Sequence, residues 1–403
     1  MSNNLNMPEL LSPAGSLDKL KVAVSYGANA VYLGGLKFGL RSAADNFTDE
    51  ELIEGVKFAH DRGVLVYVVL NGFLHDQDLS ELVEFIKYLD ELKIDAVIVS
   101  DLGVVQTVKK HTNLEVHLST QASCLNSHSA KFWKKMGVTR IVLGREVSIA
   151  EAAKIKKEAD IEIEMFIHGS MCMAYSGNCV ISNFTQGRDS NRGGCAHSCR
   201  FEYTLKFDEL DFESKNKYFM SSKDLNGLRV LEEFIKAGID SIKVEGRMKS
   251  HLYTATMSKV YSEALSFYKE HGHFLSDKLL EWEEELKKVT HRTYAPTNLI
   301  EKADASTIFN EREHASDTDY KMVGRVIEKF ENEFILIEVR NAFNLGDELE
   351  ILPFKGEKIT LKIEKMNLLN EEIIERTKPT TIVKIPFVGQ CEINNIVRAK
   401  VLS

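Results

Sequence analysis

Residues 48–70 read Thr-Asp-Glu-Glu-Leu-Ile-Glu-Gly-Val-Lys-Phe-Ala-His-Asp-Arg-Gly-Val-Leu-Val-Tyr-Val-Val-Leu, and they contain one helix, its ending and the strand after it. Thr48 followed by Glu51 predicts a capping box before a helical apolar stripe. Gly63 stands where a helix needs a left-handed residue to end. The apolar run 65–70 lacks alternation, as expected of a strand buried on both faces of a parallel sheet.

The same unit recurs along the first 270 residues. Helical patterns of about 10 to 16 residues separate the apolar runs, and several end on a glycine just before the next run. The eight runs are 9–12, 30–35, 65–70, 96–101, 115–120, 140–144, 161–167 and 241–246. Eight units fit a closed (β/α)8 TIM-like barrel. A doubly wound open sheet is the alternative, but residues 12–16, Ser-Pro-Ala-Gly-Ser, lack its glycine-rich fingerprint.

One connection is far longer than the others. More than 70 residues separate the seventh and eighth runs, and an insertion of this size is usually functional. We therefore expect a barrel over residues 1–300 with an insertion over 168–240. The insertion follows the seventh strand, which places it at the C-terminal face of the barrel, where active sites occur.

The remainder of the chain has a different pattern. Residues 301–319 are rich in small and polar side chains and predict a linker. Residues 320–403 contain six short apolar runs separated by turns, which predict a small C-terminal β-barrel domain. Modules of this kind bind RNA or dock partners, and a purely structural lid is equally compatible with the pattern.

Composition excludes some classes of protein. No run of about 18 apolar residues occurs, which argues against a membrane span, and no signal peptide is visible, so we expect a cytoplasmic protein. The six cysteines then argue for metal or redox chemistry over disulfides. The net charge of −9 excludes a globally basic nucleic-acid binder, but it leaves room for a local basic patch.

Four of the six cysteines lie in the long insertion, with the spacing Cys-x6-Cys-x15-Cys-x3-Cys. Four thiolates can hold a zinc ion or a 4Fe–4S cluster. Wide spacing favours a cluster, because zinc ribbons use close cysteine pairs, but zinc stays open. The four are Cys172, Cys179, Cys195 and Cys199, whereas Cys124 and Cys391 are expected to be buried and inert.

Ionisable side chains follow several of the predicted strands. Convergence of such residues on one barrel mouth predicts a pocket, and arginine forks suit a substrate that carries carboxylates. For any one of them taken alone, an ion pair that closes the barrel rim is the favoured role. They are Arg41 after the second strand, Arg145 after the sixth, His168 after the seventh, and Glu245, Arg247 and Lys249 after the eighth.

Several blocks resemble peptidase family U32, called collagenase-like, and within it the prephenate-dependent tRNA uridine hydroxylases. The blocks are Met-Pro-Glu-Leu-Leu-Ser-Pro-Ala-Gly (7–15), Glu-Met-Phe-Ile-His-Gly-Ser-Met-Cys-Met-Ala-Tyr-Ser-Gly-Asn-Cys-Val-Ile-Ser (164–182), Arg-Asp-Ser-Asn-Arg-Gly-Gly-Cys-Ala-His-Ser-Cys-Arg (188–200), Ser-Ser-Lys-Asp-Leu (221–225) and Lys-Val-Glu-Gly-Arg-Met-Lys-Ser (243–250). The resemblance covers nearly the whole chain.

The resemblance implies a 4Fe–4S cluster on the four cysteines and 5-hydroxylation of the wobble uridine of tRNA, with prephenate as co-substrate. It also allows a homodimer or a heterodimer with a paralogue. On this hypothesis the candidates for prephenate or phosphate binding are Arg41, Arg145, Arg247 and Lys249, and the candidates near the chemistry are His168, Tyr175 and Glu245.

Two other functions stay open. The first is a collagenase-like peptidase, although the sequence contains neither a His-Glu-x-x-His zinc motif nor a Gly-x-Ser-x-Gly elbow. The second is a zinc-stabilised scaffold that binds RNA without catalysis.

Overall fold

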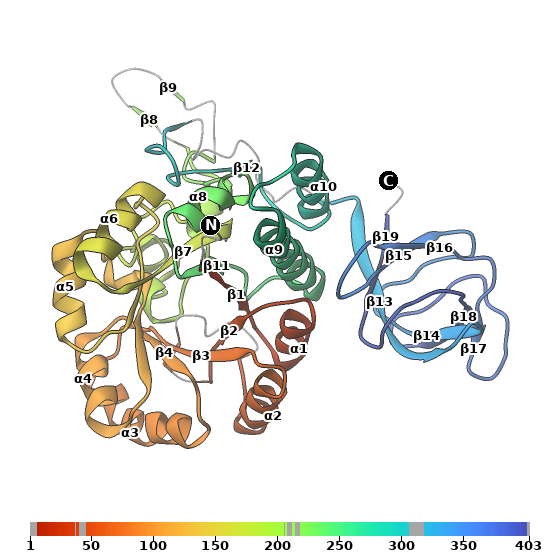
Figure 1. Ribbon diagram of the computed structural model, residues 1–403, viewed down its shortest axis with the longest axis horizontal. Coiled ribbons are helices and arrows are strands. Elements are labelled where there is room, and N and C mark those ends of the chain that lie inside the picture. Colours follow the sequence, from red (N-terminus) through yellow and green to blue (C-terminus); the bar gives the residue numbers. More distant parts are fainter. Residues whose placement is uncertain are drawn as a thin grey trace.

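The computed structural model describes residues 6–36, 38–39, 46–204, 206–207, 212–213, 218–305 and 318–400. Within these ranges the N-terminal part is a closed barrel of parallel strands (Figure 1). The last barrel strand pairs with both the first and the seventh, which closes the ring. The strands are β1 (Glu9–Pro13), β2 (Ala30–Leu33), β3 (Leu65–Leu70), β4 (Ala96–Val99), β5 (Glu115–Leu118), β6 (Arg140–Val142), β7 (Glu162–Ser170) and β11 (Ser241–Val244).

Helices surround the barrel, one after each strand. They are α1 (Leu17–Ser25), α2 (Asp49–His60), α3 (Asp76–Glu91), α4 (Leu102–His111), α5 (Ser127–Lys135), α6 (Ile149–Ala159), α8 (Leu231–Lys236) and α9 (His251–His271). The capping box of Thr48 and Glu51 begins α2 as predicted, and Gly63 has φ +71° at the turn into β3. The (β/α)8 fold class is confirmed, and each of the eight predicted strands is present. None of the described helices has the length and apolar sequence needed to cross a membrane.

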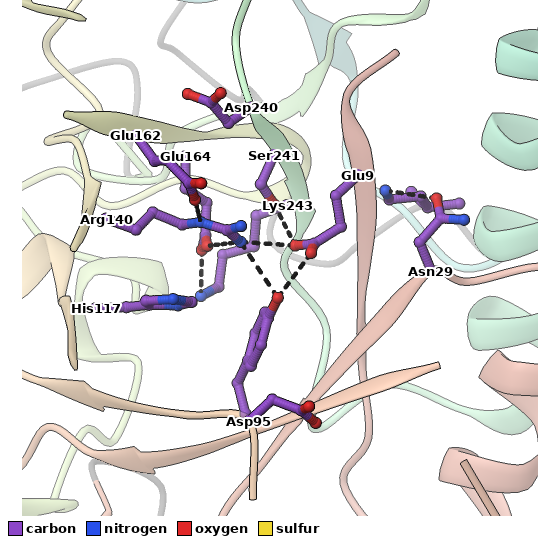
Figure 2. Close-up of polar contacts among 12 residues, drawn as sticks. Glu9, Asn29, Asp95, His117, Arg140, Glu162, Glu164, Asp240, Ser241 and Lys243 are labelled. Atoms are coloured by element: carbon purple, nitrogen blue, oxygen red, sulfur yellow. Dashed lines mark hydrogen bonds and ion pairs between the residues drawn. The ribbon is translucent and has the colours of Figure 1, made fainter. Parts of the chain in front are cut away.

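The N-terminal end of the barrel interior is filled by a buried ionic network (Figure 2). Arg140 at the start of β6 contacts Glu9 of β1 at 2.7 Å and Glu164 of β7 at 3.8 Å. Lys243 of β11 lies 2.8 Å from Glu164, and Tyr67 of β3 donates to Glu9 at 2.6 Å. Arg140 and Lys243 thus pair with the carboxylates of Glu9 and Glu164 away from water. The network fills this end of the barrel interior with ion pairs.

The long insertion carries its own short elements. They are α7 (Ile181–Gln186), the 3-10 turns η2 (Ser190–Arg192) and η3 (Ser198–Arg200), the paired strands β8 (Lys206–Phe207) and β9 (Phe212–Glu213), and β10 (Asp224–Asn226). β10 runs antiparallel to the end of β7 and parallel to β12 (Tyr294–Ala295), a segment that follows the barrel and α10 (Ser276–Leu286). The chain after the barrel therefore returns to the edge of the insertion.

The C-terminal domain is an antiparallel half-barrel with the strand order β16-β15-β19-β13-β14-β18-β17. Its strands are β13 (Tyr320–Phe330), β14 (Phe334–Val339), β15 (Glu348–Leu352), β16 (Ile359–Lys362), β17 (Asn367–Leu368), β18 (Ile382–Pro386) and β19 (Ile396–Lys400). The six predicted runs are six of these strands, and β17 was missed because it has only two residues. Most of the predicted linker, residues 306–317, lies outside the described residues.

The C-terminal domain docks beside α1, α9 and α10 (Figure 1). The Tyr26 hydroxyl donates to the Leu352 carbonyl at 2.7 Å and accepts from the Ile396 amide at 2.9 Å. Arg398, fully buried, pairs with Glu350 of its own domain at 2.6 Å and with Glu285 of α10. The larger hydrophobic core, mostly of the barrel, extends across this interface to Leu352 and Ile396, and a second core lies within the C-terminal domain.

Candidate functional site

The four clustered cysteines line one pocket at the C-terminal face of the barrel. Cys172 follows β7 by two residues, Cys179 precedes α7, Cys195 lies between η2 and η3, and Cys199 is within η3. Cys172 is exposed and the other three are half-buried. Burial raises the pKa of Cys199, Arg200 lowers it, and the other three thiols raise it further, so the four lie within electrostatic range of one another.

Hydrogen bonds among small polar side chains shape the loop that carries these cysteines. Ser182 of α7 accepts from the Ala196 amide at 3.1 Å, and Thr185 donates to Ser198 of η3 at 2.7 Å. The Asn191 side chain donates to the Cys179 carbonyl at 3.1 Å. The loop is therefore a folded unit in which α7 packs on η3.

Two contacts fasten this loop to the barrel. Gly177 has φ +80°, and a methyl group there would lie 1.9 Å from the Gln121 carbonyl oxygen, after β5. Only glycine fits such a close approach at positive φ. On the other side, Arg192 pairs with Asp78 of α3 at 2.8 Å. The cysteines thus take their positions from β5 and α3 as well as from β7.

Three guanidinium groups line the same pocket: Arg145, Arg200 and Arg292. Arg145 lies over the Phe166 ring at 4.2 Å, and its buried Nε has no hydrogen-bond partner among the described residues. Arg200 donates to the Ser222 carbonyl at 2.9 Å. Arg292 pairs with Asp224 at 3.2 Å and also has a buried Nε without a partner. The pocket therefore places three cationic groups beside the thiols.

Asp224 holds this side of the pocket together. Burial raises the pKa of its carboxyl. The charge of Lys249, together with the backbone amide and the guanidinium of Arg292, outweighs burial and holds that pKa below its usual range. Burial also lowers the pKa of Lys249, against the field of Asp224. Sequence reasoning missed Asp224 and Arg292 as a pair, because 68 residues separate them. The only sequence signal for Asp224 was its place in Ser-Ser-Lys-Asp-Leu (221–225), one of the blocks that carry the family resemblance.

Of the residues predicted near the chemistry, Tyr175 lines the cysteine pocket and His168 does not. His168 is 1% exposed, and its ring nitrogens lie 3.0 Å from the Tyr261 hydroxyl and 3.2 Å from the Tyr294 hydroxyl. Burial lowers its pKa to about 3, so the ring is neutral. Glu245 accepts from the Tyr32 hydroxyl at 3.3 Å.

Of the three predicted substrate-binding residues that the structure describes, Arg145 lies in the lining of the cysteine pocket, and Arg247 and Lys249 do not. Arg247 is buried and donates to Asn46 at 2.5 Å, while Lys249 donates to the Thr290 carbonyl at 3.2 Å. Lys249 still acts on the pocket through the field it exerts at Asp224. Arg41 lies outside the described residues.

No three His, Cys, Asp or Glu side chains of the described chain lie close enough together to coordinate one ion. The four thiols line a common pocket without converging on a single point. A single zinc ion needs all four sulfurs at about 2.3 Å from one point, whereas a 4Fe–4S cluster binds each cysteine sulfur at a different corner.

Comparison with known proteins gives relatives along the whole chain. A protein of Bacillus subtilis named tRNA hydroxylation protein P1 is 42% identical and aligns over 97% of this chain and 94% of its own. An Escherichia coli protein named 23S rRNA 5-hydroxycytidine C2501 synthase is 40% identical over 64% of this chain and 39% of its own. A Porphyromonas gingivalis protein named collagenase is 33% identical over 72% of this chain and 73% of its own.

Family models match in two consecutive parts. The model described as peptidase family U32 matches residues 15–308, which include the barrel from α1 onward and the cysteine pocket. The model described as the peptidase family U32 C-terminal domain matches residues 318–398, which form the half-barrel. Together these matches span both domains, and the chain belongs to peptidase family U32.

Proposed function

We propose that this protein is an RNA hydroxylase, and specifically that it 5-hydroxylates the wobble uridine of tRNA with prephenate as co-substrate. The names of two relatives, a tRNA hydroxylation protein and an rRNA 5-hydroxycytidine synthase, support hydroxylation of RNA. The observation that carries the proposal is that four cysteines and three arginines line one pocket at the catalytic face of a barrel.

The donor set suits a 4Fe–4S cluster held by Cys172, Cys179, Cys195 and Cys199. Thiolates are the usual ligands of such clusters, and the four thiols in the pocket lining provide one for each iron. When bound, the cluster would supply redox chemistry at the pocket. Arg200 directly follows Cys199 in the chain, and its positive charge offsets the negative charge of thiolates there.

The arginines suit a co-substrate with two carboxylates. Arg145 and Arg292 line the pocket, and a carboxylate of prephenate would accept hydrogen bonds from guanidinium groups of this kind. Asp224 pairs with Arg292 at 3.2 Å and keeps it in place beside the pocket. The role of the chain's own residues is therefore to bind and orient an anion beside the thiols.

Anaerobic purification followed by iron and sulfide analysis tests the cofactor. We expect about four of each per chain. A colourless protein that holds one zinc ion would contradict the cluster, and we expect the Cys179→Ala variant to lose most of the iron while its far-ultraviolet circular dichroism is unchanged.

Mass spectrometry of nucleosides tests the activity. tRNA from cells that lack the protein should contain less 5-hydroxyuridine, and the purified protein should restore it only when prephenate is added. Unchanged 5-hydroxyuridine in cells that also lack every related gene would reject the proposal.

The peptidase alternative is tested in the same preparation. Burial raises the pKa of Cys124 to about 11, and burial likewise raises that of Cys391, so both thiols are poor nucleophiles at neutral pH. We expect no cleavage of denatured collagen by the pure protein. Cleavage that survives replacement of all four pocket cysteines would favour a peptidase instead.

A further inference from the structure

Large apolar side chains are exposed on the loop that carries the pocket cysteines. Tyr175 is 61% exposed, Phe184 is 87% exposed and Phe201 is 40% exposed. Each follows one of the pocket cysteines by two to five residues, so all three belong to the folded loop that carries the thiols. Phe184 is the most exposed large hydrophobic side chain of the described residues. We call these three residues the aromatic rim.

The short helix α7 packs its polar side against the protein and exposes Phe184 on the opposite side, which reverses the usual arrangement. Its buried side is polar, because Ser182 is 2% exposed and lies 3.4 Å from Ser198, and Thr185 also bonds Ser198. Phe184 is about 200° around the helix from Ser182, on the opposite side. A surface helix normally buries its apolar side and exposes its polar side. The exposure of Phe184 is therefore built into the packing of α7.

The charges nearby favour an anionic partner for this rim. Arg145, Arg200 and Arg292 line the pocket, and Tyr175 lines it with them. Arg188 lies two residues after the end of α7 and is exposed. Aromatic side chains beside cationic groups are what proteins use to bind single-stranded nucleic acid, in which the bases stack on the rings and the phosphates meet the cations.

We infer that the aromatic rim is the surface on which unpaired nucleotides of the RNA substrate stack, with Phe184 as its outer platform. The inference rests on the proposed function, and it adds how the RNA is held. A base paired inside a duplex cannot reach an enclosed active site, so the target must be unpaired or extruded. Stacking of the neighbouring nucleotides on the rim keeps the strand open beside the pocket.

Binding of a labelled RNA hairpin to the full-length protein tests the inference. The probe is a hairpin of about 17 nucleotides whose loop contains uridine, measured by fluorescence anisotropy under argon and compared with a blunt duplex of the same stem. The Phe184→Ala variant should bind the hairpin on the order of tenfold more weakly, with little change for the duplex. Phe184→Trp should restore binding, and Phe184→Leu should not, because leucine is apolar without being a stacking surface.

A matched control is Phe132→Ala on α5, a half-exposed aromatic residue far from the insertion in the sequence, which should bind as the unsubstituted protein does. Iron content and thermal unfolding of each variant show that the fold is retained. Full binding by Phe184→Ala would overturn the inference and leave the proposed function standing. Full restoration by Phe184→Leu would also overturn the inference, because it would show that any apolar side chain suffices and that base stacking is not needed.

Two further results would reject the inference for different reasons. If light scattering shows a dimer for the unsubstituted protein and a monomer for Phe184→Ala, the rim contacts a second copy and the inference is wrong. If the unsubstituted protein binds no hairpin at all, the RNA substrate itself is rejected, and the proposed function fails together with the inference.

Discussion

His168 is a titratable side chain whose surroundings keep it neutral. Tyr253 and Tyr261 of α9 and Tyr294 of β12 surround its ring, with centroids 5.0 to 6.2 Å away. Burial lowers the pKa of the folded protein's His168 to about 3, whereas the unfolded chain binds this proton near pH 6.5. The unfolded state therefore takes up the proton first, and stability falls as the pH drops through that window.

Replacement of His168 with glutamine removes this titration. Between about pH 7 and about pH 5.5, the unsubstituted protein should lose about 1 kcal/mol more free energy of unfolding than His168→Gln. Urea unfolding followed by circular dichroism at the two pH values measures the difference. Equal pH dependence of the two proteins would show that His168 titrates normally in the folded state.

We predict that Arg292 binds the anionic co-substrate. In the Arg292→Ala variant the KM for prephenate should rise on the order of tenfold to a hundredfold, because a charge-assisted hydrogen bond is lost. Arg229→Ala is the matched control, since Arg229 pairs with Glu283 on the surface at 2.5 Å and should leave KM unchanged. An equal rise in both variants would contradict a specific role for Arg292.

The site could be predicted from the sequence only where its residues lie close together in the chain. The four cysteines fall within 28 residues, so their spacing alone indicated a shared site. Arg145 could be placed because it directly follows a barrel strand. Arg292 could not, because its position depends on the pairing of β10 with β12 and on Asp224, and neither has a local pattern.

At the scale of elements, the strands were predictable and the insertion was not. Runs buried on both faces have a strong apolar signal, and glycine marks the ends of the preceding helices. β10 and β17 are too short to show any periodicity. The reversed orientation of α7 also has no signal in the sequence, because a six-residue helix with one phenylalanine fits either orientation.

The loop that carries the cysteines depends on its glycine contact with β5. In Gly177→Ala, the new methyl group would meet the Gln121 carbonyl, so the loop must move away from the barrel. We expect the iron content to fall by at least about half while the barrel stays folded. Gly187→Ala is the control, since Gly187 also has positive φ (+60°) but has open space around it. Equal iron content in both variants would contradict this role for Gly177.

At the scale of the whole molecule, one tyrosine hydroxyl joins the two domains. In Tyr26→Phe the Leu352 carbonyl and the Ile396 amide each lose a partner in a buried interface. The cost should be about 1–3 kcal/mol, and amide exchange in β15 and β19 should become faster. Tyr88→Phe, whose hydroxyl contacts the Asp49 carbonyl at 3.2 Å at the surface, should show neither effect. Unchanged exchange in Tyr26→Phe would show that the remaining contacts suffice to hold the domains together.

The pairing of β11 with both β1 and β7 has a consequence for the order in which the protein is made. A ribosome releases residues in sequence order, and Cys199 leaves it about 40 residues before β11, which starts at Ser241. The ring of strands cannot close until β11 has emerged. During that interval all four thiols are attached to an open, incomplete barrel, and the newly made chain must keep them reduced until its final strand arrives.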